Sequence, residues 1–321
     1  MTAVALGPGG EFDRVRAIAR ALGARARGLG DDCAVIPAGE GALVASTDAT
    51  VQDVHFRLDW IGLGEAGWRA SAAALSDLAA AGAEPVGLLA ALVAPPGAAE
   101  NDVVELMTGI ASAGESVAAP VLGGDLSAGP AWIVTVTVLG RAARPVGRAG
   151  ARAGDGIWVT GALGGARAAL EAWRQNRLPA PEARRAFAAP SPRLAAGRWL
   201  ATHGARAMLD LSDGLAGDAG HLAAASRLAV RLELDAVPVA PAAVSEARRL
   251  DLSPEQFAAE GGEDYELLAA MPAEFHRAGA ADFEAACGLA LTWIGGAVEG
   301  SGVLATLGGR PLALRGYDHF R

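Results

Sequence analysis

Hydrophobic positions recur along the chain with two periods, one typical of helices and one typical of strands. Apolar residues spaced three and four apart predict helices over residues 11–22 and 102–114. The Ala-rich stretch 65–81 predicts a third helix, which Gly82 would terminate because glycine is common just past a helix end. Residues 132–139 alternate and are rich in β-branched side chains, so they form the clearest predicted strand.

Short apolar runs of strand length lie between and beyond these helices. They cover residues 42–46, 86–93, 157–160, 207–211, 230–234, 266–270 and 291–294. The first of these strands is expected to end at Thr47 and Asp48. Further helices are expected over 166–174 and after Gly214, with a proline-rich segment at 179–192. This alternation predicts an α/β or α+β fold.

A stretch rich in proline, glycine and arginine divides the chain near its middle, at residues 145–156. The chain has 321 residues, which is more than the roughly 100–150 of a common single domain. We therefore predict two domains, residues 1–147 and 148–321.

Composition narrows the class of protein. Hydrophobic residues make up 52% of the chain and the mean hydropathy is +0.28, so a large core can be buried. The longest apolar runs fall short of the ~20 residues that span a bilayer, and residues 1–10 carry no signal-peptide pattern. We therefore expect a cytoplasmic protein without membrane contact, in which Cys33 and Cys287 are reduced thiols.

The charge pattern excludes several functions. The chain has 27 basic and 36 acidic residues, a net charge of −9, and no basic stripe of the kind that binds nucleic acid. All 27 basic residues are arginine. A P-loop, the phosphate site of a protein kinase and Schiff-base chemistry each need a lysine, so all three are excluded.

Aspartates gather where apolar runs end in small residues, and Asp77 lies inside the apolar helix 65–81. The strand-end set is Asp32, Asp48, Asp125, Asp210 and Asp213. If several converge, their repulsion requires cations, and oxygen ligands without a Cys/His set favour Mg²⁺. Each aspartate alone also suits a helix cap or turn, and Asp77 also suits an exposed stripe of its helix.

His55 and the glycine turns at 123–124, 161–165 and 261–262 are candidate contacts to phosphate, although each also suits a structural role. The chain contains no Gly-x-Ser-x-Gly elbow, His-Glu-x-x-His or paired Cys-x-x-Cys. Hydrolase triads and zinc sites therefore have no support.

An ordered series of motifs resembles the thiamine-monophosphate kinase family. The motifs are GEFDRVR (10–16), GLGDDCAV (28–35), STDATVQDVHF (46–56), LSDLAAAGAEP (75–85), GGD (123–125), GDGIWVTGALG (154–164), DLSDGL (210–215), GGEDYEL (261–267) and GYDHF (316–320). GGD alone is unspecific, whereas STD, LSDLAAAGA, DLSDGL and GGEDYEL together are highly specific. The family shares its superfamily with aminoimidazole ribonucleotide synthetase, selenophosphate synthetase and the hydrogenase maturation ATPase.

The resemblance implies a two-domain aminoimidazole ribonucleotide synthetase-like fold. Its N-terminal α/β domain would bind metal and ATP and pair its sheet with a second subunit, and an α+β C-terminal domain would complete the substrate site. The implied reaction is direct in-line transfer of the γ-phosphoryl group of ATP to thiamine monophosphate on several Mg²⁺ ions, giving thiamine diphosphate. The implied assembly is a homodimer with the site between the domains.

The resemblance also implies roles for individual residues. The implied metal ligands are Asp32, Ser46, Thr47, Asp48, Asp77, Asp125, Asp210 and Asp213. The implied nucleotide contacts are Gly124, Asp125, Arg148 and Ser212, and the implied contacts to thiamine phosphate are His55, Glu263 and Tyr317. No obligatory base is expected, since positioning and charge neutralisation through Asp48, Asp77 and Asp125 can carry the transfer.

The chain departs from the family pattern at a few positions. Arg69 and Ala74 stand where lysine and asparagine are usual, Leu126 and Ser127 follow GGD in place of two threonines, and Asp53 replaces a small residue. These departures affect the expected nucleotide and metal geometry and leave the carboxylate set complete.

Two alternatives remain open. One is a sister synthetase, but selenophosphate synthetase normally needs a reactive N-terminal Cys or Sec with a lysine, and the purine enzyme lacks GGEDYEL. The other is a non-catalytic nucleotide-binding protein. The retention of all six aspartates argues against such a loss of activity.

Overall fold

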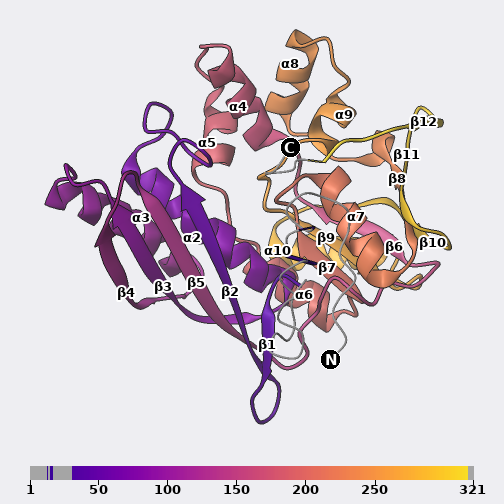
Figure 1. Cartoon of the computed structure of the whole chain (residues 1–321). Helices are drawn as coiled ribbons and strands as arrows, with labels where there is room; N and C mark the ends of the chain where they lie inside the picture. Colours follow the sequence, from indigo (N-terminus) through magenta and orange to yellow (C-terminus); the bar gives the residue numbers. More distant parts are fainter. Residues whose placement is uncertain (1–12, 14, 17–30, 317–321) are drawn as a thin grey trace.

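The computed structural model describes residues 13, 15, 16 and 31–316, and it folds the chain around two β-sheets (Figure 1). Asp13, Val15 and Arg16 are helical, while the rest of the predicted helix 11–22 lies outside the described residues. Tyr317 also lies outside them.

The N-terminal sheet has five strands in the order β1-β2-β5-β3-β4. The strands are β1 (Ala34–Pro37), β2 (Ala42–Val51), β3 (Glu84–Ala94), β4 (Val121–Ala128) and β5 (Ile133–Ala142). Only the β3–β4 pair is parallel. The expectation that the strand beginning at Ala42 ends at Thr47 and Asp48 is wrong, because β2 continues through both to Val51. Their partners in β5 satisfy the backbone over the full length.

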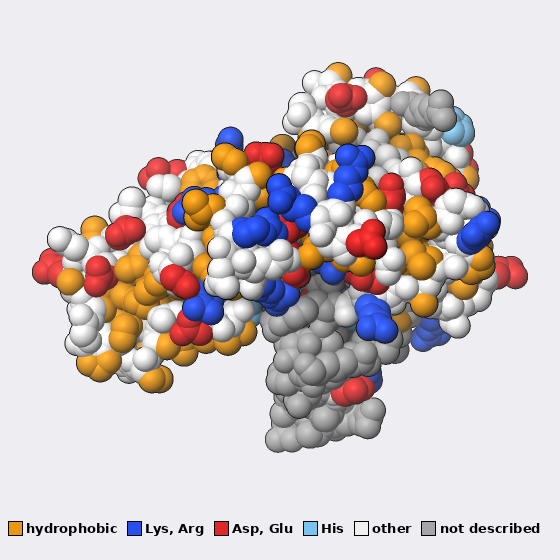
Figure 2. Space-filling view, turned by 90° about the horizontal axis from the view of Figure 1, so that it is seen from above, with side chains coloured by type: hydrophobic (Ala, Val, Ile, Leu, Met, Phe, Trp, Pro, Cys, Tyr) orange, Lys and Arg blue, Asp and Glu red, His pale blue; other side chains and the backbone are white. Residues whose placement is uncertain are grey.

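Helices α2 (Leu63–Ala80) and α3 (Glu100–Glu115) cover one face of this sheet (Figure 1). The period-two pattern of β5 explains why: Val134, Val136 and Val138 are fully buried beneath the helices, and the residues between them face the other way. In residues 31–316 no helix packs on that other face. Hydrophobic side chains gather over this domain in the space-filling view (Figure 2).

The C-terminal sheet has seven strands in the order β12-β11-β8-β10-β6-β9-β7. The strands are β6 (Gly156–Thr160), β7 (Ala207–Asp210), β8 (Ala229–Glu233), β9 (Leu267–Met271), β10 (Leu291–Val298), β11 (Gly302–Leu307) and β12 (Arg310–Leu312). The β8–β11 pair is parallel and the other pairs are antiparallel.

Helices lie beside this second sheet, and several of them pack mainly on one another. They are α4 (Gly165–Arg174), α5 (Pro181–Ala188), α6 (Leu194–Thr202), α7 (Leu215–Ser226), α8 (Pro241–Arg249), α9 (Pro254–Ala259) and α10 (Arg277–Cys287), with the short 3-10 helix η2 (Leu234–Ala236). Helix α5 occupies a segment expected only to be proline-rich. Pro181 stands in the first turn of α5, where proline is tolerated because its missing N–H has no intrahelical partner.

One hydrophobic core continues from the N-terminal sheet into the C-terminal half, and α2 lies at the junction. It packs against α6 and β7 as well as against its own sheet. A Cβ on Gly197 of α6 would lie 1.9 Å from the carbonyl oxygen of Ala79, so this close approach requires glycine. The predicted mixed α/β class is confirmed, while the boundary at residues 147/148 remains a prediction.

Two smaller expectations can also be compared with the structure. Cys33 and Cys287 are both free thiols. None of the helices in the described part of the chain is long and apolar enough to cross a bilayer.

Candidate active site

Three aspartates from distant parts of the chain meet at the junction of the two halves. Asp32 precedes β1, Asp77 lies on α2 and Asp210 ends β7. One carboxylate oxygen from each lies within 4.8 Å of the others. Asp77 therefore faces a shared site, and the alternative that it lies on an exposed stripe of its helix is wrong.

Neighbouring groups hold these carboxylates in place. Oδ1 of Asp32 accepts hydrogen bonds from Nε and Nη2 of Arg148, at 3.0 and 2.5 Å. The hydroxyl of Ser46 donates to Oδ2 of Asp77 at 2.5 Å, and the hydroxyl of Ser76 donates to Oδ2 of Asp210. Predicted ligands Ser46, Asp32, Asp77 and Asp210 thus lie together.

Burial and mutual repulsion make this cluster unfavourable when it is fully charged. Burial raises the pKa of Asp77 well above its usual value, and the charges of Asp210 and Asp32 raise it further. Burial and the charge of Asp32 raise the pKa of Asp210 to about 7. Near neutral pH Asp77 and Asp210 are therefore poised to exchange protons for a cation.

The donor set fits a hard divalent cation. Oδ2 of Asp32 is buried and has no hydrogen-bond partner among the described residues. A buried carboxylate oxygen without a hydrogen bond destabilises the folded protein unless a bound cation compensates its charge. Oxygen-only ligands suit Mg²⁺ better than zinc, so the residues present fit the implied ion.

The β2 run Ser46-Thr47-Asp48 is split between the two faces of its sheet. Ser46 reaches Asp77 on the helix-covered face, and the charge of Asp48 raises the pKa of Asp77, so Asp48 also adjoins the cluster. Thr47 lies on the opposite face, since successive strand residues alternate. Its hydroxyl is 3.0 Å from that of Thr137. The Thr47 side chain is therefore not brought to the cluster.

Gly124 and Asp125 lie on β4, at the far edge of the N-terminal sheet. Strands β5 and β3 separate β4 from β2, which amounts to about 14 Å at the usual strand spacing. Asp125 is in register with Ala91 on the face away from the helices. Within one chain, the structure does not bring these two predicted nucleotide residues to the cluster.

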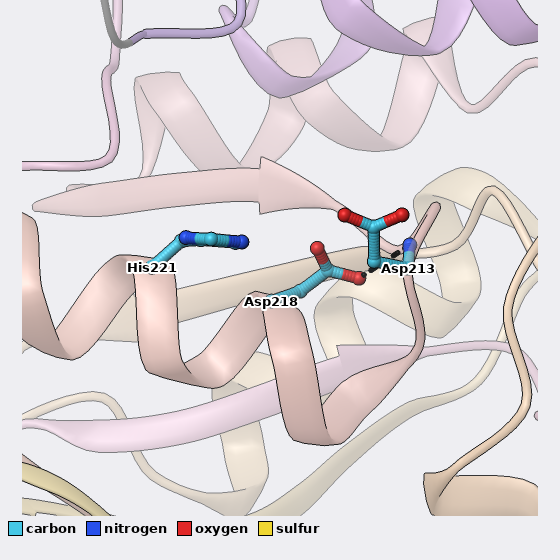
Figure 3. Close-up of side chains that lie close together, drawn as sticks. All are labelled: Asp213, Asp218 and His221. Atoms are coloured by element: carbon cyan, nitrogen blue, oxygen red, sulfur yellow. Dashed lines mark hydrogen bonds between the residues drawn. The ribbon is translucent and has the colours of Figure 1, made fainter. Parts of the chain in front are cut away.

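A second group lies one step further along the chain and includes residues that the motif analysis did not single out. Asp213 precedes α7, while Asp218 and His221 are one turn apart on it (Figure 3). The backbone N–H of Asp213 donates to Oδ2 of Asp218 at 3.1 Å. Burial lowers the pKa of His221 to about 4, so its imidazole is neutral at pH 7 and suited to ligation. The i, i+3 spacing after DLSDGL was the available signal.

The segment 261–266 brings two further predicted residues together. The N–H of Glu263 donates to the carbonyl oxygen of Ser212 at 2.8 Å. A Cβ on Gly262 would lie 2.5 Å from that same oxygen, so the approach needs glycine. The carboxylate of Asp264 accepts the N–H of Gly164 at 2.9 Å, which anchors the segment beside α4.

His55 lies in the tight turn that follows β2. Its Nδ1 accepts the N–H of Val51 at 3.0 Å. In the neutral ring the proton is then on Nε2, which can donate to an anion. Asp53, one of the departures from the family pattern, adopts φ 64° in this turn, a conformation that aspartate tolerates better than most residues.

The other departures lie in different environments. Arg69 is buried on α2 and forms an ion pair with Glu263. Ala74 is fully buried in the core, while the Leu126 side chain is 58% exposed on the edge strand. Motif comparison marked Arg69 as unusual, but its contact with a predicted substrate residue became visible only in the structure.

Comparison with known proteins places this geometry in context. Residues 30–142 match the model of the AIR synthase related protein N-terminal domain, and residues 152–304 match that of its C-terminal domain. The thiamine-monophosphate kinase of Escherichia coli (strain K12) is 36% identical, over 96% of this chain and 95% of the relative. That of Mycobacterium tuberculosis (strain ATCC 25618 / H37Rv) is 37% identical, over 75% and 74%. The solved structure of AaThiL complexed with AMPPCP and TMP is 30% identical, with a TM-score of 0.87 over 97% of both chains.

Proposed function

The chain belongs to the thiamine-monophosphate kinase family, and we propose that it transfers the γ-phosphoryl group of ATP to thiamine monophosphate, giving thiamine diphosphate and ADP. The observation that carries this proposal is the Asp32–Asp77–Asp210 cluster, with Asp48 beside it, at the junction of the two halves. The similarity to a structure solved with AMPPCP and TMP supports both substrates.

Bound Mg²⁺ would neutralise the phosphates that approach one another during the transfer. Asp32, Asp48, Asp77 and Asp210 are the residues that would hold it, and Asp213 would hold a further ion with Asp218 and His221. This arrangement suits a chain without lysine, since no ammonium group is available for the triphosphate.

The chain's own cationic and polar groups would orient the two substrates. Arg148, whose Nε and Nη2 already donate to Asp32, would contact a nucleotide phosphate through its remaining N–H groups, and Ser212 adjoins Glu263 in the neighbouring segment. His55 and Glu263 would contact thiamine monophosphate. Because the acceptor is itself a phosphate, no side chain is needed as an obligatory base.

We also propose that two copies pair through the open face of the N-terminal sheet. This face presents apolar residues such as Ile36 and Leu89, which are 50% and 38% exposed. Thr47 and Asp125 lie on the same face. A partner sheet packed there would bury the apolar surface. It would also bring the second molecule's Asp125 to the face that carries Thr47.

The decisive assay follows thiamine diphosphate formation from thiamine monophosphate and Mg-ATP. Wild-type enzyme should give equal amounts of thiamine diphosphate and ADP, and no product with unphosphorylated thiamine. Asp48→Asn should abolish the product, while Asp282→Asn, an exposed carboxylate on α10, should leave it unchanged. Binding of ATP without product would overturn the proposal and favour a sister synthetase or a non-catalytic nucleotide-binding protein.

A further inference from the structure

Arg69 is a charged side chain enclosed where three elements meet. It comes from α2 and is only 2% exposed. Its Nη1 donates to the carbonyl oxygen of Phe187 in α5 at 2.7 Å, and its guanidinium carbon lies 3.9 Å from the centre of the Phe187 ring. Its Nη2 forms an ion pair with Oε1 of Glu263. One side chain thus contacts both α5 and the segment 261–266.

The Glu263 end of this pair is the accessible one. Its side chain is 28% exposed, whereas Arg69 is covered by the ring of Phe187. The Glu263 backbone is fixed too, with φ 65° and its N–H bonded to Ser212. Both the main chain and one carboxylate oxygen of Glu263 are therefore held before any ligand arrives.

We propose that Arg69 is a positioning residue, which fixes Oε1 of Glu263 so that Oε2 is presented to thiamine monophosphate. The inference rests on the proposed function, since it deepens the role of Glu263 there. Thiamine monophosphate carries a cationic thiazolium and an aminopyrimidine that donates N–H groups, and a carboxylate oxygen complements both. Holding the carboxylate in advance removes the entropic cost of ordering it upon binding.

The departure from the usual lysine fits this role. A guanidinium presents nitrogens in a planar fork, so Nη1 can serve the Phe187 carbonyl while Nη2 serves Glu263. An ammonium group is a compact point charge and satisfies two such partners less well.

The test compares KM for thiamine monophosphate across a small set of variants. Arg69→Gln keeps a donor for the Phe187 carbonyl and removes the charge that faces Glu263. Arg69→Lys restores the charge, and Glu263→Gln removes the negative charge that faces Arg69. Arg184→Gln is the matched control, because Arg184 also ties α5 to α2, through Glu65 at 2.6 and 2.8 Å, without touching Glu263.

Arg69→Gln should raise KM for thiamine monophosphate about tenfold, a size typical of losing one charged hydrogen bond. Its kcat and its KM for ATP should stay within threefold of wild type. Arg69→Lys should recover most of the loss, and Arg184→Gln should change neither constant. The double variant Arg69→Gln/Glu263→Gln should be no worse than Glu263→Gln alone.

An unchanged KM in folded Arg69→Gln, or additive effects in the double variant, would overturn the inference. If Arg69→Gln does not fold, the double variant takes its place because it has no unpaired carboxylate; a KM tenfold above that of Glu263→Gln would then refute the inference. A wild-type enzyme without thiamine diphosphate synthesis refutes the proposed function instead, before any variant is compared.

Discussion

Two nitrogens of Arg148 donate hydrogen bonds to a single oxygen of Asp32, with Nε at 3.0 Å and Nη2 at 2.5 Å from Oδ1. Arg148 follows the N-terminal sheet, and the backbone N–H of the same residue donates to Oδ1 of Asp31 at 2.8 Å. Oδ2 of Asp32 is left buried beside the acidic cluster. The Asp32 carboxylate therefore faces the guanidinium of Arg148 on one side and, in our proposal, a bound metal ion on the other.

Replacing Arg148 with methionine should destabilise the metal-free protein by about 3 kcal/mol, because removing one partner of a buried ion pair leaves an uncompensated charge. Added Mg²⁺ should recover part of the loss. Urea unfolding in EDTA and in Mg²⁺ measures both effects. Arg174→Met is the control, since the Arg174–Glu171 pair is exposed on α4; an equal loss in both variants would contradict the interpretation.

Asp77→Asn should lower the activity of the protein and raise the stability of its metal-free form. The rate of thiamine diphosphate formation should fall at least about a hundredfold, the usual size for losing one electrostatic contact at a reacting phosphate. The metal-free variant should melt at a higher temperature than wild type at pH 8, because asparagine replaces a carboxyl group whose ionised form is disfavoured by burial and by its acidic neighbours. Steady-state kinetics and thermal unfolding measure the two. Normal Mg²⁺-dependent activity would remove Asp77 from the site.

The stability of the metal-free protein should depend on pH in an unusual direction. The pKa of Asp210 is about 7 in the folded protein against 3.8 for the free group, so the folded state binds more protons in that interval. The contribution of Asp210 to stability therefore decreases as pH rises from about 4 to 7, and the penalty is fully present above pH 7.

Thermal unfolding in EDTA between pH 5 and 8 measures this dependence. Saturating Mg²⁺ should stabilise the protein more at pH 8 than at pH 5, and Asp210→Asn should flatten the metal-free profile. Identical pH slopes with and without Mg²⁺ would show that the cluster does not bind the ion.

A charge on the open sheet face should prevent dimer formation. Ala91 on β3 is in register with Asp125 and Thr135 on that face, so Ala91→Arg places a guanidinium in the proposed interface. Light scattering after gel filtration should show a folded monomer with little activity. Val104→Arg, an exposed position on α3, should remain dimeric. A monomeric wild-type enzyme would refute the dimer.

Much of the site could be predicted from the sequence, because residue type limits what a side chain can ligate. One aspartate from each of GLGDDCAV, LSDLAAAGA and DLSDGL, namely Asp32, Asp77 and Asp210, does lie in a common cluster, while their role as metal ligands stays a prediction. The prediction that the strand beginning at Ala42 ends at Thr47 was wrong because the apolar run stops before the backbone pairing does. Helix α5 and the contact between Arg69 and Glu263 had no such local signal.

The sequence by itself determined the family, the predicted carboxylate ligands and the absence of lysine chemistry, since these depend on which residues occur and in what order. The tertiary structure decided which of these residues lie close together. Strands β5 and β3 insert between β2 and β4, so Asp48 and Asp125 lie about three strand spacings apart. The reason is physical: strand order follows from burying β5 at the centre of the sheet beneath α2, a long-range packing preference that no local pattern expresses.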